Sequence, residues 1–464
     1  MNTENTRPAN SISTWLRESV MVKITVIGLL ILFLLIPSSW VNSLMEERQG
    51  RVTEAIEEVS QKWSTAQHVT GPMLVLPYKK TIITKITTAD KKTEDKIETY
   101  TEEASFLPHE LNINGNLKPQ NLTRGIFDVV VYNSTIAMKG YFEKPNLATL
   151  GIKPEDVYWN KAYLVNGLSD LRGIGENPKI SFNHTVYQSE PSNMFEESNL
   201  FRKNFSSFVR ISPSDSIIPF TISFPLKGSS NLYFYPMGKS THVTLAGEWS
   251  NPKFDGFYLP ENRNVTERFT ANWKILNFNR PFPQQWVTTP ANIESTAFGV
   301  NLIMPVDQYQ KSIRTSKYGI LIILLTFVSL LLIELIVKKH IHPFQYTLIG
   351  IALTIYYTLL LSISEHIGFN FSYLISSAVI IMLISLYSIS IFNNRKITAL
   401  LASLLTIFYT YIFVITQQQD YALLLGSIGL LIIIAVLMYV SRKIDWYGAR
   451  NKTIQQHENE TTAH

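Results

Sequence analysis

The chain has 464 residues, of which 46% are hydrophobic, and its formal net charge at pH 7 is +5. Its basic residues either flank apolar runs or are interspersed with acids, so the unbalanced basic patch of a nucleic-acid-binding protein is absent from the sequence. The chain contains no cysteine, which excludes disulfides, thiolate metal sites and thiol catalysis. We therefore expect no nucleic-acid partner, and no motif indicates a cofactor.

The first long apolar run covers residues 22–41 and has residues 24–36 as its core. Basic Arg17 and Lys23 stand at its start, and acidic Glu46 and Glu47 follow it, which favours an N-terminus in the cytoplasm. A cleaved signal peptide is the alternative. The length of the run and the proline at position 37 favour an uncleaved membrane anchor.

A helix of charged and apolar residues is predicted directly after this run, over residues 44–66. One apolar stripe recurs at three- and four-residue spacing, as on one face of a helix: Val52, Ala55, Ile56, Val59 and Trp63. We expect this stalk helix to pack on its own domain, with a partner helix as the alternative.

After Gly71-Pro72 the pattern changes to short segments rich in β-branched and aromatic residues, punctuated by Pro, Gly and Asn. Predicted strands cover residues 73–78, 81–87, 127–132, 135–142, 162–166, 179–183, 220–226, 232–235, 242–246 and 269–275. Residues 227–231 predict a hairpin loop, and the polar stretch 190–204 predicts a helix- or loop-like insertion. The similar phrases Phe106-Leu107-Pro108 and Tyr258-Leu259-Pro260 suggest two related lobes.

Five further apolar runs, each long enough to cross a bilayer, occupy residues 319–337, 345–363, 371–392, 397–416 and 421–440. The breaks between them alternate between basic residues and neutral or acidic ones. This alternation is what the positive-inside rule produces in a chain that crosses a membrane repeatedly. It returns the C-terminus to the cytoplasm, beside Arg442 and Lys443.

These patterns predict an α+β membrane protein. Six transmembrane helices, one N-terminal and five C-terminal, are expected, with a large β-rich, sandwich-like extracytoplasmic domain between the first and the second. The expected segments are a cytoplasmic tail at 1–21, transmembrane helix 1 at 22–41, a stalk helix at 42–70, the β-rich domain at 71–316, the five-helix bundle at 317–441 and a cytoplasmic tail at 442–464.

No motif for catalysis is present in the sequence. There is no Gly-x-Ser-x-Gly nucleophile phrase, and Arg172-Gly173-Ile174-Gly175 lacks the third glycine of a nucleotide loop, so a turn is the better interpretation. His340 and His342 have no third metal ligand nearby in sequence. We therefore expect a protein that is not an enzyme, with no catalytic, cofactor or metal residues.

Five polar residues at the breaks between apolar runs are the candidate functional or anchoring residues: Glu334, His342, Gln345, Glu365 and His366. Glu334 is the only acid inside an apolar run, and Lys338 lies four residues on, at the spacing of a helical ion pair. All five stand near the two membrane interfaces and not at the midplane, where ion-coupled transporters place their charges. Anchoring of the helices is the favoured role.

Ordered phrases at these junctions resemble the CreD family of bacterial inner-membrane proteins. They include Asp307-Gln308-Tyr309, His342-Pro343-Phe344-Gln345-Tyr346, Ser364-Glu365-His366-Ile367-Gly368-Phe369, Leu423-Leu424-Leu425-Gly426 and Ile444-Asp445-Trp446-Tyr447. The resemblance implies a multi-pass protein of the inner membrane with residues 42–316 in the periplasm and a role in envelope integrity or stress. It supplies no catalytic or binding residues to transfer.

The leading hypothesis is a non-enzymatic sensing, binding or scaffolding protein that acts through its periplasmic domain. Its expected partners are the lipid bilayer and an envelope protein or envelope component bound by that domain. The alternatives are a transporter or lipid-handling membrane protein and, with the least support, an envelope hydrolase.

Overall fold

The computed structural model describes residues 20–87, 93–192, 201, 203–288, 290, 292–302, 307–418 and 421–442. The chain divides into two compact units. One unit, here called the bundle, comprises residues up to Arg51 and from Pro305 onward, and the other, the β-domain, comprises Val52–Met304. The predicted α+β class is confirmed: an N-terminal apolar helix is followed by a large β-sheet domain and then by five apolar helices.

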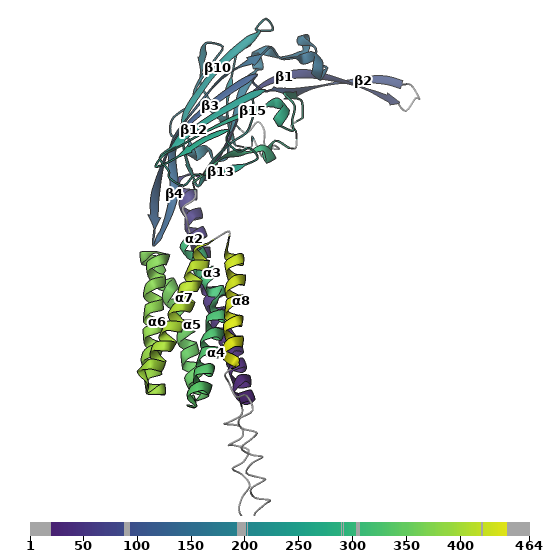
Figure 1. The fold of residues 1–464 in the computed structure, drawn as a ribbon. Coiled ribbons are helices and arrows are strands. Elements are labelled where there is room, and N and C mark those ends of the chain that lie inside the picture. The colour runs from purple at the N-terminus through teal and green to yellow at the C-terminus, as the bar shows by residue number, and fades with distance from the viewer. Residues whose placement is uncertain are drawn as a thin grey trace, which may run out of the picture. The chain divides into compact units, whose positions relative to one another are not determined.

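The helices of the described chain are α2 (Val20–Trp63), α3 (Asp307–Lys317), α4 (Gly319–Val337), α5 (Pro343–Ile367), α6 (Phe369–Phe392), α7 (Arg395–Gln417) and α8 (Ala422–Ser441). All but α3 are long and apolar enough to cross a membrane, which makes six candidate spans in the part of the chain that the structure describes. Figure 1 shows α4 to α8 as neighbouring rods within the bundle.

The polar breaks between the apolar runs also mark where the helices end and begin. Lys338 and Asn393 take left-handed backbone conformations at the ends of α4 and α6, each with φ of 54°. Asn394 then caps α7, because its side-chain oxygen accepts a hydrogen bond from the backbone N–H of Lys396 at 2.9 Å. Asparagine tolerates the left-handed region and is a preferred N-cap, so a two-residue break is enough to reverse the chain.

Helix α3 covers residues 307–316, which the sequence analysis assigned to the β-rich region. It belongs to the bundle unit. Tyr309, Ser312 and Thr315 are buried at a spacing of three residues along one face. The helix was overlooked because its buried face carries hydroxyl groups and lacks an apolar stripe, so hydropathy gives no signal.

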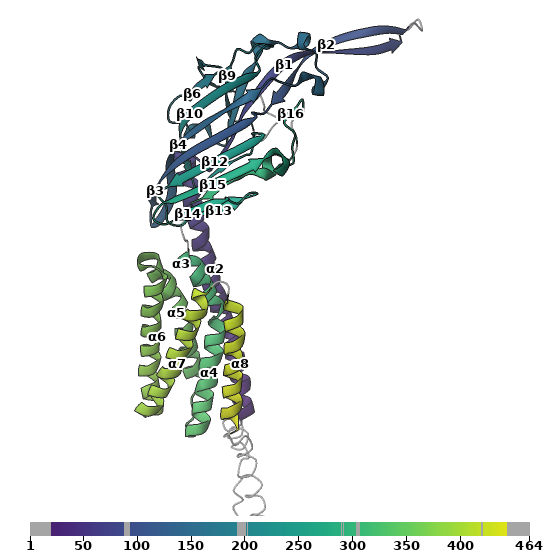
Figure 2. The same ribbon diagram turned by 45° about the horizontal axis from the view of Figure 1, so that its top comes forward.

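In the described part of the β-domain, seventeen strands form two sheets. Figure 2 shows several strands of the two sheets. The nine-stranded sheet contains β1 (Gln67–Thr87), β2 (Thr93–Phe106), β5 (Tyr163–Leu168), β8 (Glu190–Ser192), β9 (Asn204–Phe208), β11 (Asn231–Phe234), β13 (Lys253–Gly256), β16 (Gln285–Trp286) and β17 (Phe298–Asn301). The eight-stranded sheet contains β3 (Glu110–Arg124), β4 (Phe127–Glu143), β6 (Lys179–Phe182), β7 (Thr185–Tyr187), β10 (Ile217–Ser229), β12 (Ser240–Gly247), β14 (Asn262–Val265) and β15 (Phe269–Leu276).

The main path of the nine-stranded sheet runs β13-β17-β11-β1-β5-β9-β8, with β2 beside β1 and β16 beside β2. The eight-stranded sheet runs β14-β15-β12-β3-β4-β10-β6-β7. Each sheet contains one parallel pair, β1 with β11 and β3 with β12, and the remaining pairs are antiparallel. Both parallel pairs join a strand from the first half of the domain to one from the second half.

Buried side chains of the two sheets meet in one hydrophobic core, as the sandwich-like prediction requires. Phe205 on β9 packs edge-on against Phe224 on β10, with ring centroids 5.4 Å apart. Trp273 on β15 meets Phe298 on β17 at 5.7 Å. Each pair joins a strand of one sheet to a strand of the other, so the aromatic rings tie the two layers together.

The predicted hairpin at residues 227–231 is wrong. β10 and β11 flank this segment, but β10 pairs with β4 and β6 in one sheet, while β11 pairs with β1 and β17 in the other. Ser230, with φ of 62°, therefore lies at a corner where the chain crosses between sheets. Turn chemistry alone does not reveal whether the next strand returns to the same sheet or joins another.

Strands β2 and β3 were absent from the predicted set. β2 contains four glutamates, and β3 contains several asparagines and Pro119, which are poor signals for a strand. Both are held by long pairings. β2 pairs with β1 from Thr93 opposite Thr87 to Phe106 opposite Leu74, and β3 pairs with most of β4. Long-range pairing overrides the weak local preference here.

The structure also places the two similar phrases and the polar stretch 190–204. The phrases Phe106-Leu107-Pro108 and Tyr258-Leu259-Pro260 each stand where the chain leaves the nine-stranded sheet for the eight-stranded one. In the polar stretch 190–204, residues 190–192 form β8, which pairs with β9. Residues 193–200 and 202 lie outside the described residues.

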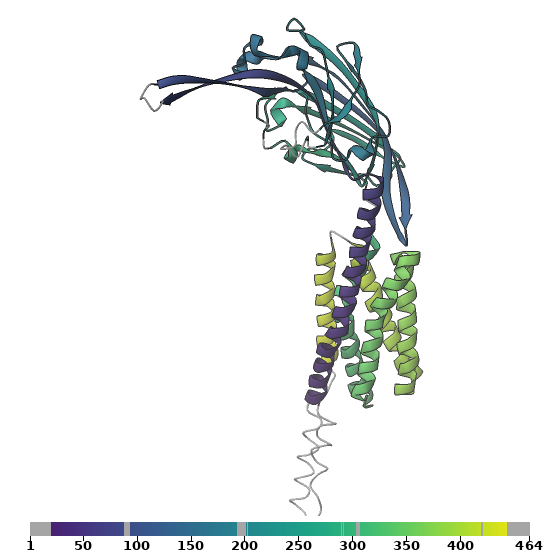
Figure 3. The same ribbon diagram turned by 180° about the vertical axis from the view of Figure 1, so that it is seen from behind.

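The distal parts of β1 and β2 form a two-stranded arm that projects from the sheet (Figures 1 and 3). We call residues 79–87 and 93–101 the arm. Ile83 pairs with Ile97 across it, and these side chains are 61% and 65% exposed. On the opposite face, Lys80 forms an ion pair with Glu102 at 2.7 Å. The arm thus exposes a cross-strand pair of isoleucine side chains on one face and carries an ion pair on the other.

A buried carboxylate joins the end of α2 to the rest of the β-domain. The side chain of Asp170, 3% exposed, forms an ion pair with Arg172 at 2.8 Å and accepts a hydrogen bond from the backbone N–H of Thr65 at 3.1 Å. Arg172 also donates to the carbonyl of Gln61, in the last turn of α2, at 2.6 Å. We call these groups, together with Gln67, the Asp170 clasp.

Gln67 completes the clasp from the first residue of β1. Its Nε2 donates to the backbone carbonyls of Asp170 at 2.8 Å and Lys227 at 3.1 Å. A Cβ at position 173 would lie 2.4 Å from both this Nε2 and the Lys227 carbonyl oxygen, so only glycine fits there. The predicted turn at Arg172-Gly173-Ile174-Gly175 is confirmed, and its first glycine is required by this close approach.

Replacing Gly173 by alanine is expected to lower the free energy of unfolding of the full-length protein by about 1–3 kcal/mol, the usual cost of overpacking. Gly175→Ala is the matched control, because a Cβ there meets Pro225 at an ordinary 3.5 Å. Denaturant unfolding of the detergent-solubilised protein, followed by tryptophan fluorescence, measures both. Equal losses in the two variants would contradict the proposed role of the clasp.

The clasp also predicts a pH dependence. Burial alone would raise the pKa of Asp170, but hydrogen bonds from Arg172 and Thr65 outweigh it and lower the pKa from 3.8 to about 2. The carboxylate therefore stabilises the fold fully above about pH 4, and this contribution disappears as the pH falls through 2. We expect the stability gap between wild type and Asp170→Asn to shrink between pH 4 and pH 2. Asp156→Asn, outside the clasp, should show no such convergence in thermal melts.

Candidate functional site

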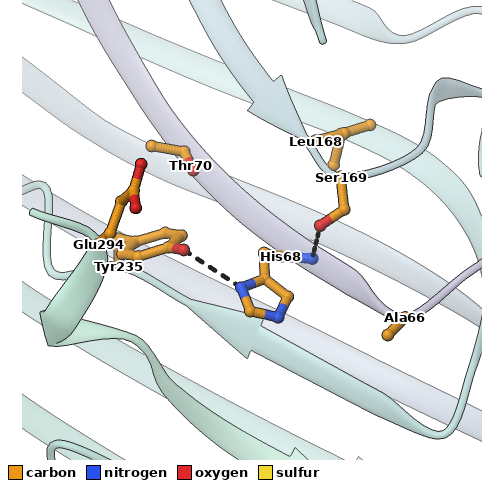
Figure 4. A pocket seen from close by; sticks show the side chains of 7 residues that line it. All are labelled: Ala66, His68, Thr70, Leu168, Ser169, Tyr235 and Glu294. Atoms are coloured by element: carbon orange, nitrogen blue, oxygen red, sulfur yellow. Dashed lines mark hydrogen bonds between the residues drawn. The ribbon is translucent and has the colours of Figure 1, made fainter. Parts of the chain in front are cut away.

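The β-domain contains an open cavity of about 500 Å³, whose lining includes His68 and Ser169, the chain neighbours of Gln67 and Asp170 in the clasp. Figure 4 shows the side chains that line it. Its walls come from four segments of the chain: the start of β1, the end of β5, the residue after β11 and the short helix Glu294–Thr296. The lining residues are Ala66, His68, Thr70, Leu168, Ser169, Tyr235 and Glu294. Its volume lies in the range of small-molecule sites.

The geometry of β1 explains why three of these residues face the cavity. Ala66, His68 and Thr70 alternate along the chain, and alternate side chains of a strand point to the same face. The pairing of β1 with β5 shifts register between Thr70 and Met73. Gly71 lies in this shift with φ of 105°, and a Cβ there would come within 2.8 Å of the Val165 carbonyl oxygen.

His68 is the central polar group of the cavity. Its Nδ1 lies 3.1 Å from the hydroxyl of Tyr235, and the backbone N–H of His68 donates to the hydroxyl of Ser169 at 2.8 Å (Figure 4). Tyr233 packs edge-on against the imidazole, with centroids 5.1 Å apart. Two tyrosine side chains thus contact the imidazole, and Ser169 holds the backbone of His68.

The protonation states in the cavity follow from burial and from one charge. Burial lowers the pKa of His68 below its ordinary 6.5, so the imidazole is neutral at pH 7. Burial, reinforced by the negative charge of Glu294, raises the pKa of Tyr235 to about 12, so the phenol stays protonated. Either ring can donate the hydrogen bond between them, and the other then accepts it.

The arrangement is suited to binding. The Ser169 hydroxyl accepts from the backbone of His68, and no hydrogen bond to the imidazole joins the two side chains into a nucleophile–base pair. Within the described ranges no three His, Asp or Glu side chains gather as metal ligands would. The cavity offers two aromatic rings, hydroxyl groups and one carboxylate.

No sequence pattern marks this cavity. Its residues belong to segments up to 228 positions apart, from Ala66 to Glu294, and none stands in a recognisable motif. The one local signal is the alternation of Ala66, His68 and Thr70 at the start of a strand, which was hidden because the strand was expected to begin after Gly71-Pro72. β1 begins at Gln67.

The candidate residues from the sequence lie elsewhere, on the bundle. His342 and Gln345 form a capping box at the start of α5: the backbone N–H of Phe344 donates to Nδ1 of His342 at 3.2 Å, and the backbone N–H of His342 donates to Oε1 of Gln345 at 3.0 Å. Such a box satisfies amide groups that the first turn leaves unpaired. This geometry accounts for both residues by helix capping alone.

Glu334 is buried in the bundle, with its side chain 2% exposed. It forms an ion pair with Lys23 on α2 at 2.6 Å and accepts a hydrogen bond from the hydroxyl of Tyr346 on α5 at 2.9 Å. Nδ1 of His340 lies 3.0 Å from the same Lys23 nitrogen. The predicted pairing of Glu334 with Lys338 is wrong. The left-handed backbone of Lys338 ends α4, and its exposed side chain lies outside this network.

Glu365 lies near the other end of α5. The hydroxyl of Tyr309 on α3 donates to it at 3.2 Å, and Arg48 on α2 lies 3.9 Å away. His366 is exposed. At 1.5 Å per residue, His342 and Glu365 are about 35 Å apart along α5, so the five residues form two separate end clusters and not one site.

The chain matches one family of known proteins along nearly its whole length. The sequence profile of the CreD family, described as inner membrane protein CreD, matches residues 19–447. The inner membrane protein CreD of Escherichia coli strain K12 is 28% identical over 443 residues, which cover 93% of this chain and 95% of that protein.

The likeness to solved structures is slight. A mutant M1 zinc metallopeptidase from Deinococcus radiodurans is 7% identical and aligns over 36% of this chain and 39% of its own, with a TM-score of 0.18. A putative protease from Parabacteroides distasonis is 8% identical over 55% of this chain and 50% of its own, with a TM-score of 0.24. Neither score establishes a shared fold.

The Lys23–Glu334 pair yields a prediction for the bundle. Lys23→Met leaves a buried carboxylate without its cation and is expected to cost roughly 2–4 kcal/mol of stability. Lys338→Met is the control and should change stability by less than about 0.5 kcal/mol. Adding Glu334→Gln to Lys23→Met should restore part of the loss, because the unpaired charge is then removed. Circular dichroism melts in detergent give the comparison, and equal losses for the two lysines would refute the pairing.

Proposed function

This chain belongs to the CreD family of inner membrane proteins, and we propose that it is a non-enzymatic protein of bacterial envelope integrity or envelope stress response. In this proposal the bundle anchors the protein in the bilayer. The β-domain binds an envelope component, or a segment of an envelope protein, in the cavity around His68. The cavity is the observation that carries the proposal, because it is preformed, of ligand size and lined by fixed polar groups.

The proposed orientation places residues 1–21 and 442–464 in the cytoplasm and residues 42–316 in the periplasm. Its support is the alternation of charge at the breaks between apolar helices, with Lys338 and Arg395 on one side and Glu365 on the other. Residues 317–441 then form the five-helix transmembrane part, and residues 42–70 the stalk. The cavity faces the envelope in this arrangement.

The five break residues are proposed to anchor and orient the bundle, as helix caps and ion-pair partners. His342 and Gln345 supply the capping box of α5, Glu334 joins α2 to α4 and α5, and Glu365 joins α3 and α5. His366 is exposed beside Glu365, and we propose that it faces the headgroup region. None is assigned a ligand-binding role.

A second candidate function is transport or lipid handling through the bundle. It is favoured by one observation: the hydroxyls of Tyr357 and Tyr409, whose rings flank that of Tyr356, are buried with no hydrogen-bond partner among the described residues. Their rings pack together, with Tyr356 centroids 4.8 Å from Tyr357 and 4.7 Å from Tyr409. Unpartnered hydroxyls in an apolar bundle are unfavourable and suit a polar solute or water.

The proposed function is tested by a substitution that fills the cavity with a large side chain. Ala66→Trp is expected to abolish rescue of a null strain challenged with detergent or a cell-wall antibiotic, with the protein still present in the membrane. Ala148→Trp, on an exposed short helix of the same domain, should rescue fully. If Ala66→Trp rescues as well as wild type while Tyr357→Phe and Tyr409→Phe do not, the function lies in the bundle and the transport candidate is preferred.

A further inference from the structure

The charge inventory of the cavity is unusually simple. Of the seven described residues that line it, Glu294 is the one carboxylate, none is Lys or Arg, and burial lowers the pKa of His68 below its ordinary 6.5. The cavity is therefore negative at neutral pH. An anionic ligand such as a phosphate would meet repulsion and no cationic partner.

Glu294 has no ion-pair partner among the residues that the structure describes. It stands at the start of the short helix Glu294–Thr296, with its carboxylate beside the ring of Tyr235 (Figure 4). Its negative charge acts on a group in the cavity wall, because it helps to raise the pKa of the Tyr235 phenol. A carboxylate that lines a cavity without a cation of its own is free to pair with one brought by a ligand.

The walls beside this carboxylate are aromatic. The ring centroids of His68 and Tyr235 are 6.1 Å apart, with the rings tilted at 47°. The face of a tyrosine ring attracts a cation in addition to burying apolar surface. The hydroxyls of Ser169 and Tyr235 supply further acceptors for N–H groups.

We propose that this cavity selects a ligand with a positively charged amino group and excludes anions. In the geometry proposed, the ammonium pairs with Glu294 over the Tyr235 ring, and the remainder of the ligand lies along His68 and Ser169. This inference rests on the proposed function, which makes the cavity the binding site. It adds the chemical class of the ligand.

A divalent metal is not the cation in question. Among the described residues that line the cavity, His68 and Glu294 are the only metal-ligand side chains, and Nδ1 of His68 is already engaged with Tyr235. A metal site needs three or four such donors. An organic ammonium needs one carboxylate and neighbouring acceptors, which the cavity provides.

The absence of cysteine from the whole chain permits a direct test on the full-length protein in detergent. Ser169→Cys places a single thiol in the cavity wall. Its rates of modification by cationic 2-(trimethylammonium)ethyl and anionic 2-sulfonatoethyl methanethiosulfonate are measured and divided by each other. Dividing this ratio by that of a surface thiol, Ser250→Cys, removes the intrinsic difference between the reagents.

One unpaired charge several ångströms from the thiol should raise the normalised cation-to-anion ratio roughly three- to tenfold above that of the surface thiol. Adding Glu294→Gln should return it close to 1. Adding Glu176→Gln, which removes an exposed carboxylate outside the cavity, should leave it unchanged. A normalised ratio at or below 1, or one that Glu294→Gln does not alter, overturns the proposal.

A second thiol position keeps the test decisive if Ser169→Cys does not fold. Ala66→Cys lies in the same wall and removes no hydrogen bond; the same two outcomes apply. Failure here is distinct from failure of the proposed function. A cavity that prefers cations while Ala66→Trp still rescues the null strain would refute only the envelope role, and a cavity needed for rescue but indifferent to charge would refute only the ligand class.

Discussion

The Asp170 clasp is the constraint on which the β-domain and its cavity depend. Gln67 belongs to the clasp, and the residue after it, His68, lines the cavity. Likewise Asp170 belongs to the clasp, and the residue before it, Ser169, lines the cavity. His68 and Ser169 are joined by a hydrogen bond from the His68 N–H to the Ser169 hydroxyl and one from the Ser169 N–H to the His68 carbonyl at 3.2 Å. The clasp thus fixes the backbone from which both walls of the cavity project.

This arrangement separates two tasks that buried polar groups often combine. The clasp carboxylate is fully engaged by Arg172 and backbone N–H groups, so it has no capacity left for a ligand. Glu294 is exposed and lacks an ion-pair partner among the described residues. The protein itself therefore satisfies the Asp170 carboxylate, whereas the Glu294 carboxylate has room for a ligand.

Those features that depend on short stretches of chain could be predicted from the sequence. Apolar helices and their breaks are local, since a run of bilayer length and residues such as Asn393 and Asn394 carry the signal themselves. The strands rich in β-branched and aromatic residues, such as 269–275, were predictable for the same reason. The α+β class followed from these two patterns.

What the sequence did not reveal depends on partners far along the chain. β3 is a strand because β4 pairs with it, despite its asparagines. The segment around Ser230 is a corner and not a hairpin because β11 joins another sheet. Glu334 finds Lys23, 311 residues away, in place of the nearby Lys338, and the cavity collects four distant segments. Local propensity contains no information about such pairings.

The continuity of β1 has a mechanical consequence. One strand of 21 residues lines the cavity with its first residues and forms half of the arm with its last, so about 60–70 Å of extended backbone runs from His68 toward the tip. The pairing of β1 with β5 shifts register between Thr70 and Met73, within this stretch. A load on the arm tip is therefore transmitted to the cavity wall through covalent bonds, without an intervening loop to absorb it.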